Sequence, residues 1–254
     1  MLTIENLTFR YTRRSPEVLR GVSLSLSDGE IGVVLGRNGS GKTTLFKAIL
    51  GLERPAAGSI AFDGQELLTM SRAKRARLVA YVPQEIRFGA LSVRDSVLAG
   101  RVARFGLRAG AEDFAAAEAA LREMDLLPLA ERSVEELSGG ERQKVAIARA
   151  LAQEPRLMIF DEPTGNLDVA NEDRLLRTAK RLAREKNIAV LCSLHDLNQA
   201  IGVGDRFYFL KDGAVCASGG RECFTPELIR DVFDVDVRLA ELDGRKILLG
   251  GIIE

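Results

Sequence analysis

Apolar and polar residues along this chain follow two patterns, and each predicts a different kind of strand. Short, nearly continuous apolar runs predict strands that are buried on both faces; they are residues 31–35, 78–82, 157–160 and 188–192. Residues 22–27 instead alternate apolar and polar side chains, as in an antiparallel strand with one exposed face. The chain should therefore combine a buried α/β core with a small antiparallel sheet.

The small sheet is expected near the N-terminus. Residues 2–11 are expected to form a strand with Leu7, Phe9 and Tyr11 on one face. Residues 58–62 precede Asp63-Gly64, a dipeptide typical of hairpin turns.

Helical patterns dominate the middle of the chain. Ser92 with Asp95, and Ser138 with Glu141, have the spacing of capping boxes, and the second pair precedes a helix over residues 142–153. A third helix is indicated by apolar residues at helical spacing before Pro128: Phe114, Ala117, Leu121 and Met124. We therefore expect one domain over residues 1–254, with a core of 1–84 and 156–224, a helical subdomain of 85–155, and a C-terminal helix and hairpin over 225–254.

A glycine-rich motif follows the first apolar run, residues 31–35. Residues 36–43 read G-x-x-x-x-G-K-T, the spacing of a P-loop, and a helical stretch follows them. The backbone N–H groups of such a loop and the start of the next helix bind phosphate oxygens. Lys42 can then reach the β- and γ-phosphates, and the Thr43 hydroxyl can bind Mg²⁺. The sequence therefore predicts a nucleotide site that includes Gly36, Arg37, Asn38, Gly39, Ser40, Gly41, Lys42, Thr43 and Thr44.

Two later strands end in residues suited to catalysis. Asp161 and Glu162 follow the run 157–160, where Asp161 can hold Mg²⁺ through water and Glu162 can activate the attacking water. His195, the only histidine, lies three residues beyond the run 188–192, where it can hydrogen-bond the γ-phosphate.

Gly139 and Gly140 lie just inside a predicted helix start, where each costs about 1 kcal/mol relative to alanine. Two explanations are open. Another molecule could approach the bare helix end closely, or the helix could pack tightly against a loop.

Taken together, these residues closely resemble an ATP-binding cassette ATPase, and the resemblance covers nearly the whole chain. The most specific element is Leu-Ser-Gly-Gly-Glu-Arg-Gln at 137–143, just ahead of the Asp-Glu strand.

The resemblance implies a P-loop NTPase (RecA-like) core and makes Glu162 the catalytic base and His195 the switch residue. It adds Gln84 as a contact to Mg²⁺ or water, Asp168 at a dimer seam, and Tyr11 as the aromatic stacked on adenine. Phe9 is the second candidate for stacking, and a buried role for Tyr11 stays open. Residues Ser138, Gly139, Gly140 and Glu141 would bind the γ-phosphate held by the opposite subunit of a homodimer.

The resemblance also implies a transport partner. Residues 97–101 and 195–200, together with the tail from Thr225, are similar to importer ATPases for iron-siderophore, haem and cobalamin. Such a subunit drives a separate membrane permease, and a substrate-binding protein delivers the cargo. Gly165-Asn166-Leu167-Asp168 departs from the commoner Ser-Ala-Leu-Asp and favours an exporter-type cassette as one alternative. A soluble cassette in cluster assembly or DNA repair is another.

Composition limits the partners and the cell compartment that we expect for this chain. Lys and Arg number 36, equal to Asp and Glu, so a nucleic-acid partner is not expected. No apolar run approaches the ~20 residues of a membrane span, and no secretory signal is expected. The three cysteines, Cys192, Cys216 and Cys223, form no C-x-x-C pair, which favours reduced thiols in a cytoplasm. We expect a cytoplasmic protein held at the inner membrane face by its permease.

Overall fold

The computed structural model describes residues 1–84, 88–106, 108–163, 169–242 and 245–250. Within these residues a central six-stranded sheet has the order β10-β9-β3-β8-β7-β6. All neighbouring pairs are parallel except β9 and β10. Its strands are β3 (Ile31–Leu35), β6 (Val79–Val82), β7 (Leu157–Phe160), β8 (Ala189–Ser193), β9 (Arg206–Lys211) and β10 (Ala214–Gly219). The predicted α/β class is confirmed.

Two smaller antiparallel sheets flank this centre. The N-terminal sheet has the order β2-β1-β4-β5, and the C-terminal hairpin pairs β11 with β12. Their strands are β1 (Leu2–Phe9), β2 (Leu19–Leu26), β4 (Ala57–Phe62), β5 (Gln65–Glu66), β11 (Val237–Leu242) and β12 (Arg245–Gly250). Residues 243–244, between the last two strands, lie outside the described residues.

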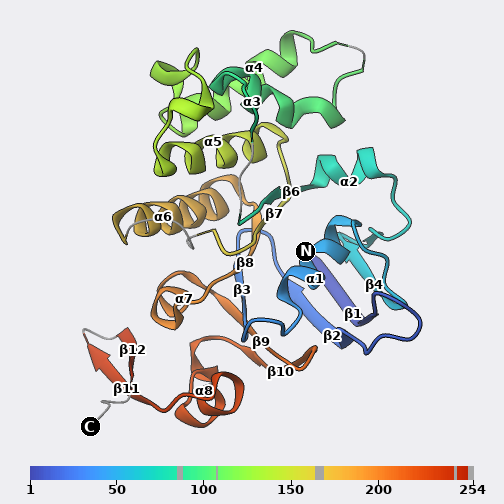
Figure 1. The fold of residues 1–254 in the computed structure, drawn as a ribbon, viewed down its shortest axis with the longest axis vertical. Coiled ribbons are helices and arrows are strands. Elements are labelled where there is room, and N and C mark those ends of the chain that lie inside the picture. The colour runs from blue at the N-terminus through green and yellow to red at the C-terminus, as the bar shows by residue number, and fades with distance from the viewer. Residues whose placement is uncertain (85–87, 107, 164–168, 243–244, 251–254) are drawn as a thin grey trace.

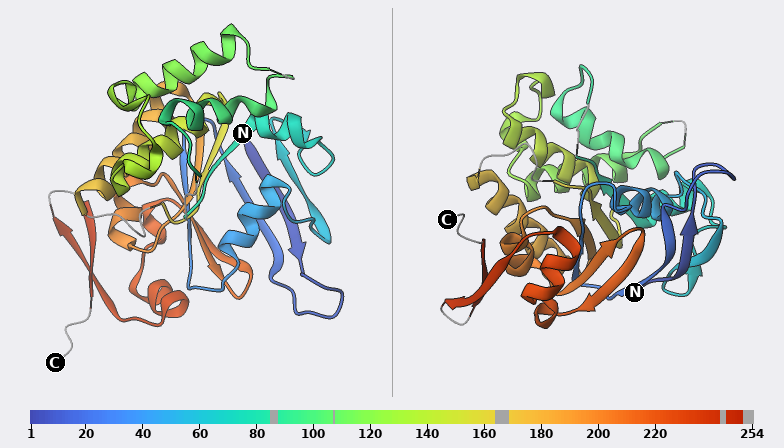
Figure 2. Two further views of the ribbon diagram at one scale, coloured as in Figure 1. Left: turned by 45° about the horizontal axis from the view of Figure 1, so that its top comes forward. Right: turned by 60° about the horizontal axis from the view of Figure 1, so that its bottom comes forward.

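The inserted helices and α1 lie in different parts of the molecule. The helices inserted between β6 and β7 lie together at one end of the molecule, whereas α1 lies beside the N-terminal sheet (Figures 1 and 2). The α-helices are α1 (Lys42–Leu50), α2 (Arg72–Leu78), α3 (Val93–Leu98), α4 (Ala111–Glu123), α5 (Gly139–Ala152), α6 (Val169–Lys186), α7 (Leu197–Val203) and α8 (Pro226–Phe233). Short 3₁₀ helices are η1 (Ala99–Ala103), η2 (Leu127–Leu129), η3 (Val134–Glu136) and η4 (Arg221–Cys223). None of the described helices is long and apolar enough to cross a membrane.

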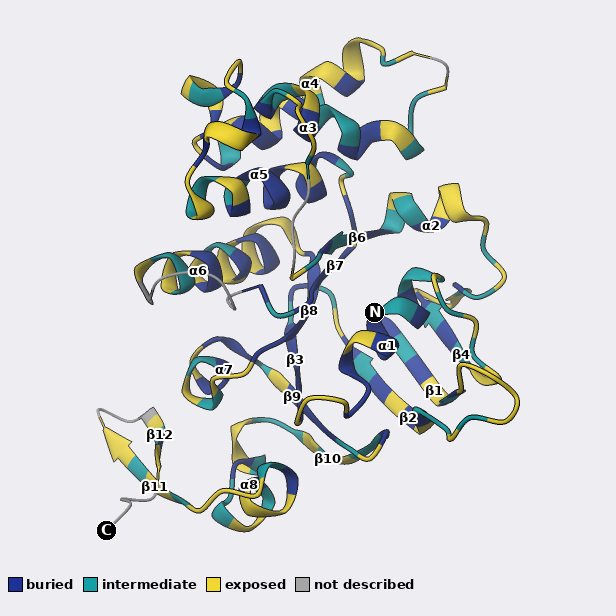
Figure 3. Ribbon diagram, viewed as in Figure 1, coloured by how far each residue is buried: buried dark blue, intermediate teal, exposed yellow. Residues whose placement is uncertain are grey.

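Strands β3, β7 and β8 are buried along their whole length, which explains their continuous apolar runs, whereas the edge strand β10 is partly exposed (Figure 3). Side chains alternate between the two faces of β3. Val33 belongs to a hydrophobic cluster with helices α4 to α8, whereas Val34 belongs to a second cluster with α1 and the N-terminal sheet. The carboxyl edge of the sheet therefore lies between two filled layers, with the phosphate loop at that edge.

Three sequence expectations differ from the structure. The first strand ends at Phe9 instead of Tyr11, because the chain leaves the sheet after Phe9 accepts a hydrogen bond from the Val18 backbone N–H. Phe114 is 51% exposed, and the buried apolar side chains of α4 are Ala117, Ala120 and Leu121. Leu78, expected to start a strand, ends α2 instead, which begins at the side-chain cap of Ser71.

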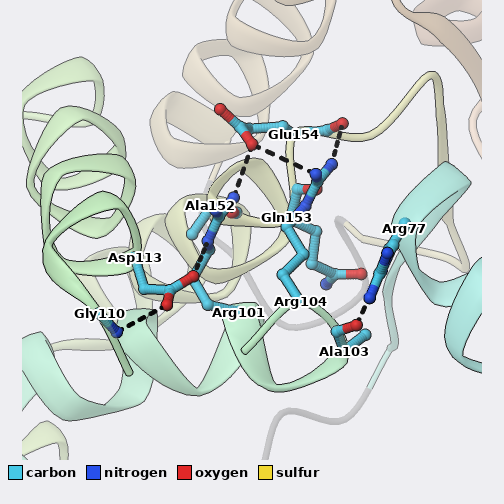
Figure 4. Close-up of polar contacts among 9 residues, drawn as sticks. All are labelled: Arg77, Arg101, Ala103, Arg104, Gly110, Asp113, Ala152, Gln153 and Glu154. Atoms are coloured by element: carbon cyan, nitrogen blue, oxygen red, sulfur yellow. Dashed lines mark hydrogen bonds and ion pairs between the residues drawn. The ribbon is translucent and has the colours of Figure 1, made fainter. Parts of the chain in front are cut away.

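A buried arginine joins the inserted helices (Figure 4). Arg101 pairs with Asp113 of α4 at 3.0 Å and with Glu154 at 2.7 Å, and it donates to the Ala152 carbonyl oxygen at the end of α5 at 2.9 Å. Its neighbour Gly100 packs so closely that a Cβ there would lie 2.1 Å from the Arg149 carbonyl oxygen. The stretch 97–101 therefore serves helix packing in this chain.

Replacing Arg101 with alanine should lower the free energy of unfolding by about 3 kcal/mol, because it leaves Asp113 and the end of α5 without their buried donor. Urea unfolding followed by circular dichroism measures the change. Arg122→Ala is the matched control, since its pair with Glu118 is exposed and should contribute less than about 1 kcal/mol. Equal losses for the two variants would contradict this account.

Candidate nucleotide-binding site

The phosphate loop lies at the carboxyl end of β3 and leads directly into α1. Gly39 and Gly41 have φ angles of 82° and 109°, a region that strains residues with side chains. A Cβ at Gly36 would lie 2.2 Å from the Leu210 carbonyl oxygen. No described side chain caps α1, and its first N–H groups have no acceptor within the helix. These donors suit an anion with several oxygen atoms.

The polar side chains of Ser40 and Lys42 are buried in the same loop. Residues 37–39 are exposed at its rim. Lys42 is only 5% exposed, and its Nζ donates to the Gly36 carbonyl oxygen at 2.9 Å. The buried hydroxyl of Ser40 has no hydrogen-bond partner within the described part of the chain. A buried ammonium and an unsatisfied hydroxyl in one loop are consistent with a polyanionic ligand.

Asp161 follows β7 and is 4% exposed. It accepts hydrogen bonds from Thr43 at 3.4 Å, Ser193 at 3.1 Å and Tyr81 at 3.3 Å. Burial, and then the nearby Asp161 charge, raise the pKa of Tyr81, so its hydroxyl stays protonated and can donate. The phosphate loop, β6 and β8 thus converge on one carboxylate.

Glu162 stands between a cation and the histidine. Its Oε1 lies 3.5 Å from Lys42 Nζ, and its Oε2 lies 2.8 Å from His195 Nε2. The backbone of Glu162 is left-handed, with φ of 48°, and its N–H donates to Ser193 Oγ at 2.9 Å. The His195 side chain is 49% exposed, so it can also contact a ligand in front of the loop.

Tyr11 lies beside the phosphate loop although it is outside β1. It is 56% exposed, and its hydroxyl is 3.2 Å from Thr44 Oγ1. Its ring meets the edge of Phe9 with the centroids 5.0 Å apart. Phe9 itself is 3% exposed, so Tyr11 presents the accessible ring and is not buried in the small sheet.

The predicted signature residues begin α5. The Ser138 hydroxyl accepts from the Glu141 N–H at 3.3 Å, and Glu141 Oε2 accepts from the Ser138 N–H at 2.8 Å, which confirms the capping box. Hydrogen bonds from the side chain and backbone of Ser138 lower the pKa of Glu141. Ser138 is exposed, and α5 lies in the helical layer, apart from α1 (Figure 1).

The two glycines of this motif have different surroundings. A Cβ at Gly140 would lie 2.9 Å from the side chain of Asn171, so tight packing explains that glycine. A Cβ at Gly139 would meet no atom of the described residues within 4 Å. Open space at Gly139 leaves room for another molecule at the helix start.

Of the remaining predicted residues, the structure describes only some. Gln84 is exposed just beyond β6, the neighbour of the strand that leads to Asp161. Asp168 and Asn166 lie outside the described residues. Gln84 therefore shares the carboxyl edge of the sheet with Asp161.

Tyr81 and Ser193 contact the carboxylates, but the motifs do not identify either residue. Both are polar positions within otherwise apolar strands, and Ser193 is completely buried. A buried hydroxyl at the end of a strand is the signal that could have identified Ser193, because such groups need hydrogen-bond partners.

Comparisons with known proteins agree with this geometry. Residues 19–165 match the family described as ABC transporter. The hemin import ATP-binding protein HmuV of Burkholderia thailandensis is 38% identical over 95% of this chain and 96% of its own length. A metal-chelate type ABC transporter solved in an inward-facing conformation matches with a TM-score of 0.84 and 31% identity, over 98% of this chain and 97% of that one. A dimeric ATP-binding cassette with ADP and phosphate matches with a TM-score of 0.73 and 27% identity, over 88% of this chain and all of that one.

Proposed function

Since this chain belongs to the ABC transporter family, we propose that it is the ATP-hydrolysing motor subunit of an importer for a metal chelate. Subunits of this family are ATPases, so the chain is an enzyme that converts ATP and water to ADP and phosphate. The observation that carries the proposal is the convergence of Lys42, Glu162 and His195 at the carboxyl edge of the central sheet.

The phosphate loop holds the triphosphate of ATP. Backbone N–H groups of residues 36–43 and the uncapped start of α1 bind phosphate oxygens, and the Ser40 and Thr44 hydroxyls add donors. Lys42 exchanges its contact with Glu162 for the β- and γ-phosphates. Tyr11, exposed and linked to Thr44, stacks on adenine.

Glu162 acts as the base in hydrolysis. The water oxygen bonds to the γ-phosphorus while the bond from that phosphorus to the bridging oxygen of ADP breaks. The water proton passes to the Glu162 carboxylate, which His195 orients through the 2.8 Å contact of its Nε2 with Glu162 Oε2. His195 also hydrogen-bonds the γ-phosphate, so it links the base to the nucleotide.

The residues present fit Mg²⁺ as the cofactor of ATP. The described residues contain no cluster of three or more His, Cys, Asp or Glu that could hold a metal alone. Mg²⁺ suits such a site, because one or two carboxylates and the substrate phosphates usually hold it. Thr43, Gln84 and, through water, Asp161 would hold the ion, which neutralises charge on the phosphates.

The site is completed by a second copy of the chain. The exposed Ser138 and open Gly139 begin a helix that lies apart from the chain's own phosphate loop. In a head-to-tail homodimer, residues 138–141 of each chain bind the γ-phosphate held by its partner. Two ATP molecules then stabilise the dimer, Asp168 lies at its seam, and hydrolysis releases it.

This cycle of ATP binding and hydrolysis drives the import of a metal chelate. The likeness to a hemin import subunit and to a metal-chelate transporter supports an iron-siderophore, haem or cobalamin cargo. The chain would bind integral permease subunits at the cytoplasmic membrane face, and a substrate-binding protein would deliver the cargo to them.

Hemin uptake by reconstituted vesicles tests this proposal. The chain is purified with the membrane permease that co-purifies with it, placed in vesicles, and supplied with ATP and a hemin-loaded binding protein. We expect hemin to cross towards the ATPase side, with faster ATP hydrolysis, and Glu162→Gln to abolish both. Cargo movement in the opposite direction would support an exporter, and ATPase activity that no membrane subunit affects would support a soluble cassette.

A further inference from the structure

Two hydroxyl groups from neighbouring strands meet the carboxylate of Asp161. β6 and β8 flank β7, which leads to Asp161 (Figure 1). Tyr81 is paired with Ile159 in the sheet register, and Phe160 is paired with Cys192. Since side chains alternate along a strand, Tyr81, Asp161 and Ser193 emerge on the same face. Register thus places a hydroxyl on either side of the carboxylate.

Ser193 makes two contacts that fix its hydroxyl in one orientation. Its oxygen accepts from the Glu162 N–H at 2.9 Å, so its proton is free to donate to Asp161 Oδ1 at 3.1 Å. The side chain is completely buried, so water cannot replace either bond. Ser193 therefore ties Asp161 to the strained backbone of Glu162, whose φ is 48°.

Tyr81 acts on the other carboxylate oxygen. Its hydroxyl donates to Asp161 Oδ2 at 3.3 Å, and the rest of the ring packs against the apolar layer next to the small sheet. Thr43 also donates to Oδ1, at 3.4 Å. Both oxygens of Asp161 are thus oriented before any ligand binds.

We propose that Ser193 is a positioning residue that sets the placement of the metal-facing Asp161 relative to the base Glu162, with Tyr81 as a weaker second support. The inference rests on the proposed roles of those two carboxylates. It assigns neither Ser193 nor Tyr81 a contact with the reacting atoms.

Kinetics of Ser193→Ala, at varied ATP and at varied Mg²⁺, test the inference. The exchange adds no atom, so the protein should fold, which a thermal melt checks. We expect kcat to fall about tenfold, the concentration of Mg²⁺ for half-maximal activity to rise several-fold, and the KM for ATP to stay within twofold. In Tyr81→Phe, kcat and the Mg²⁺ concentration for half-maximal activity should change in the same directions, each by about threefold.

Matched controls separate positioning from packing. Ser96→Ala removes a buried hydroxyl that has no hydrogen-bond partner within the described residues, and Tyr208→Phe removes one that donates to the Ser25 carbonyl oxygen. Both should retain wild-type kcat and metal dependence. If Ser193→Ala also retains wild-type kcat and metal dependence, the positioning role is wrong.

Metal binding without turnover gives an independent measurement. With ADP present, free Mn²⁺ counted by electron paramagnetic resonance should show several-fold weaker binding to Ser193→Ala than to the wild type. Unchanged Mn²⁺ affinity would overturn the inference even if kcat fell. A wild-type protein that bound ADP but hydrolysed no ATP would instead count against the proposed function.

Discussion

Glu162→Gln is expected to lower ATP turnover at least 10²-fold and leave ATP binding within about threefold of the wild type. Glutamine keeps the size of the side chain but cannot accept the proton of the attacking water. It also removes the negative charge 3.5 Å from Lys42, so the ammonium stays available for phosphate. Phosphate release gives kcat, and equilibrium binding of a fluorescent ATP analogue gives the affinity.

Glu118→Gln is the control for this variant, because Glu118 is exposed and pairs only with Arg122 among the described contacts. It should hydrolyse ATP at the wild-type rate. Normal turnover by Glu162→Gln would remove Glu162 from the role of base. Loss of ATP binding as well as turnover would point to a structural role instead.

Lys42→Ala should weaken ATP binding at least 100-fold and abolish measurable hydrolysis. Lys42 is buried, and its ammonium lies against both the phosphate loop and Glu162. Without it, no lysine would offset the negative charge of Glu162 facing the γ-phosphate, so the loss combines a missing attraction with a new repulsion. Isothermal titration with ATP measures the affinity.

Lys47→Ala, later in the same helix, controls for a change in α1 itself. It should bind ATP like the wild type, since its side chain lies near the far end of α1. ATP affinity that stayed unchanged in Lys42→Ala would contradict the phosphate-binding role of the loop.

Motifs with fixed spacing allowed the catalytic edge to be predicted from sequence. The run 157–160 is a buried strand, and parallel strands end at one edge, so Asp161, Glu162 and His195 could be placed near the P-loop. Their pairing could not be predicted, because strand order depends on contacts distant in sequence. Ser193 went unrecognised for the same reason, since its partners are 31 and 32 residues away.

Helices without a motif were harder to predict. The sequence of α2 is mainly polar and basic, so it shows little apolar periodicity, and it starts at a cap with no acidic residue in its first turn. No prediction covered α6, although its buried residues recur at helical spacing: Leu175, Leu176, Ala179, Leu182 and Ala183. Tyr11 was expected to continue the strand because it alternates with Phe9 as residues on one face of a strand do. Strand pairing ends at Phe9, however, so Tyr11 lies beyond the strand and is exposed.

The stretches that resemble chelate importers have structural explanations here. Arg101 and Gly100 serve packing among the inserted helices. Asn198 exchanges two hydrogen bonds with Leu248 of the C-terminal hairpin, at 3.0 and 2.8 Å, and Asp196 caps α7. These residues therefore hold the inserted helices and the C-terminal hairpin in place in this chain.

If a second chain completes each ATP site, Glu162→Gln should form a dimer when it binds ATP, and its mass in solution shows whether it does. Light scattering should give twice the 27.7 kDa of one chain with ATP, and one chain without it. Ser138→Arg added to Glu162→Gln should still bind ATP but remain a single chain, because its side chain blocks the exposed helix start. A single-chain mass for Glu162→Gln saturated with ATP, or equal dimers with and without Ser138→Arg, would contradict the shared site.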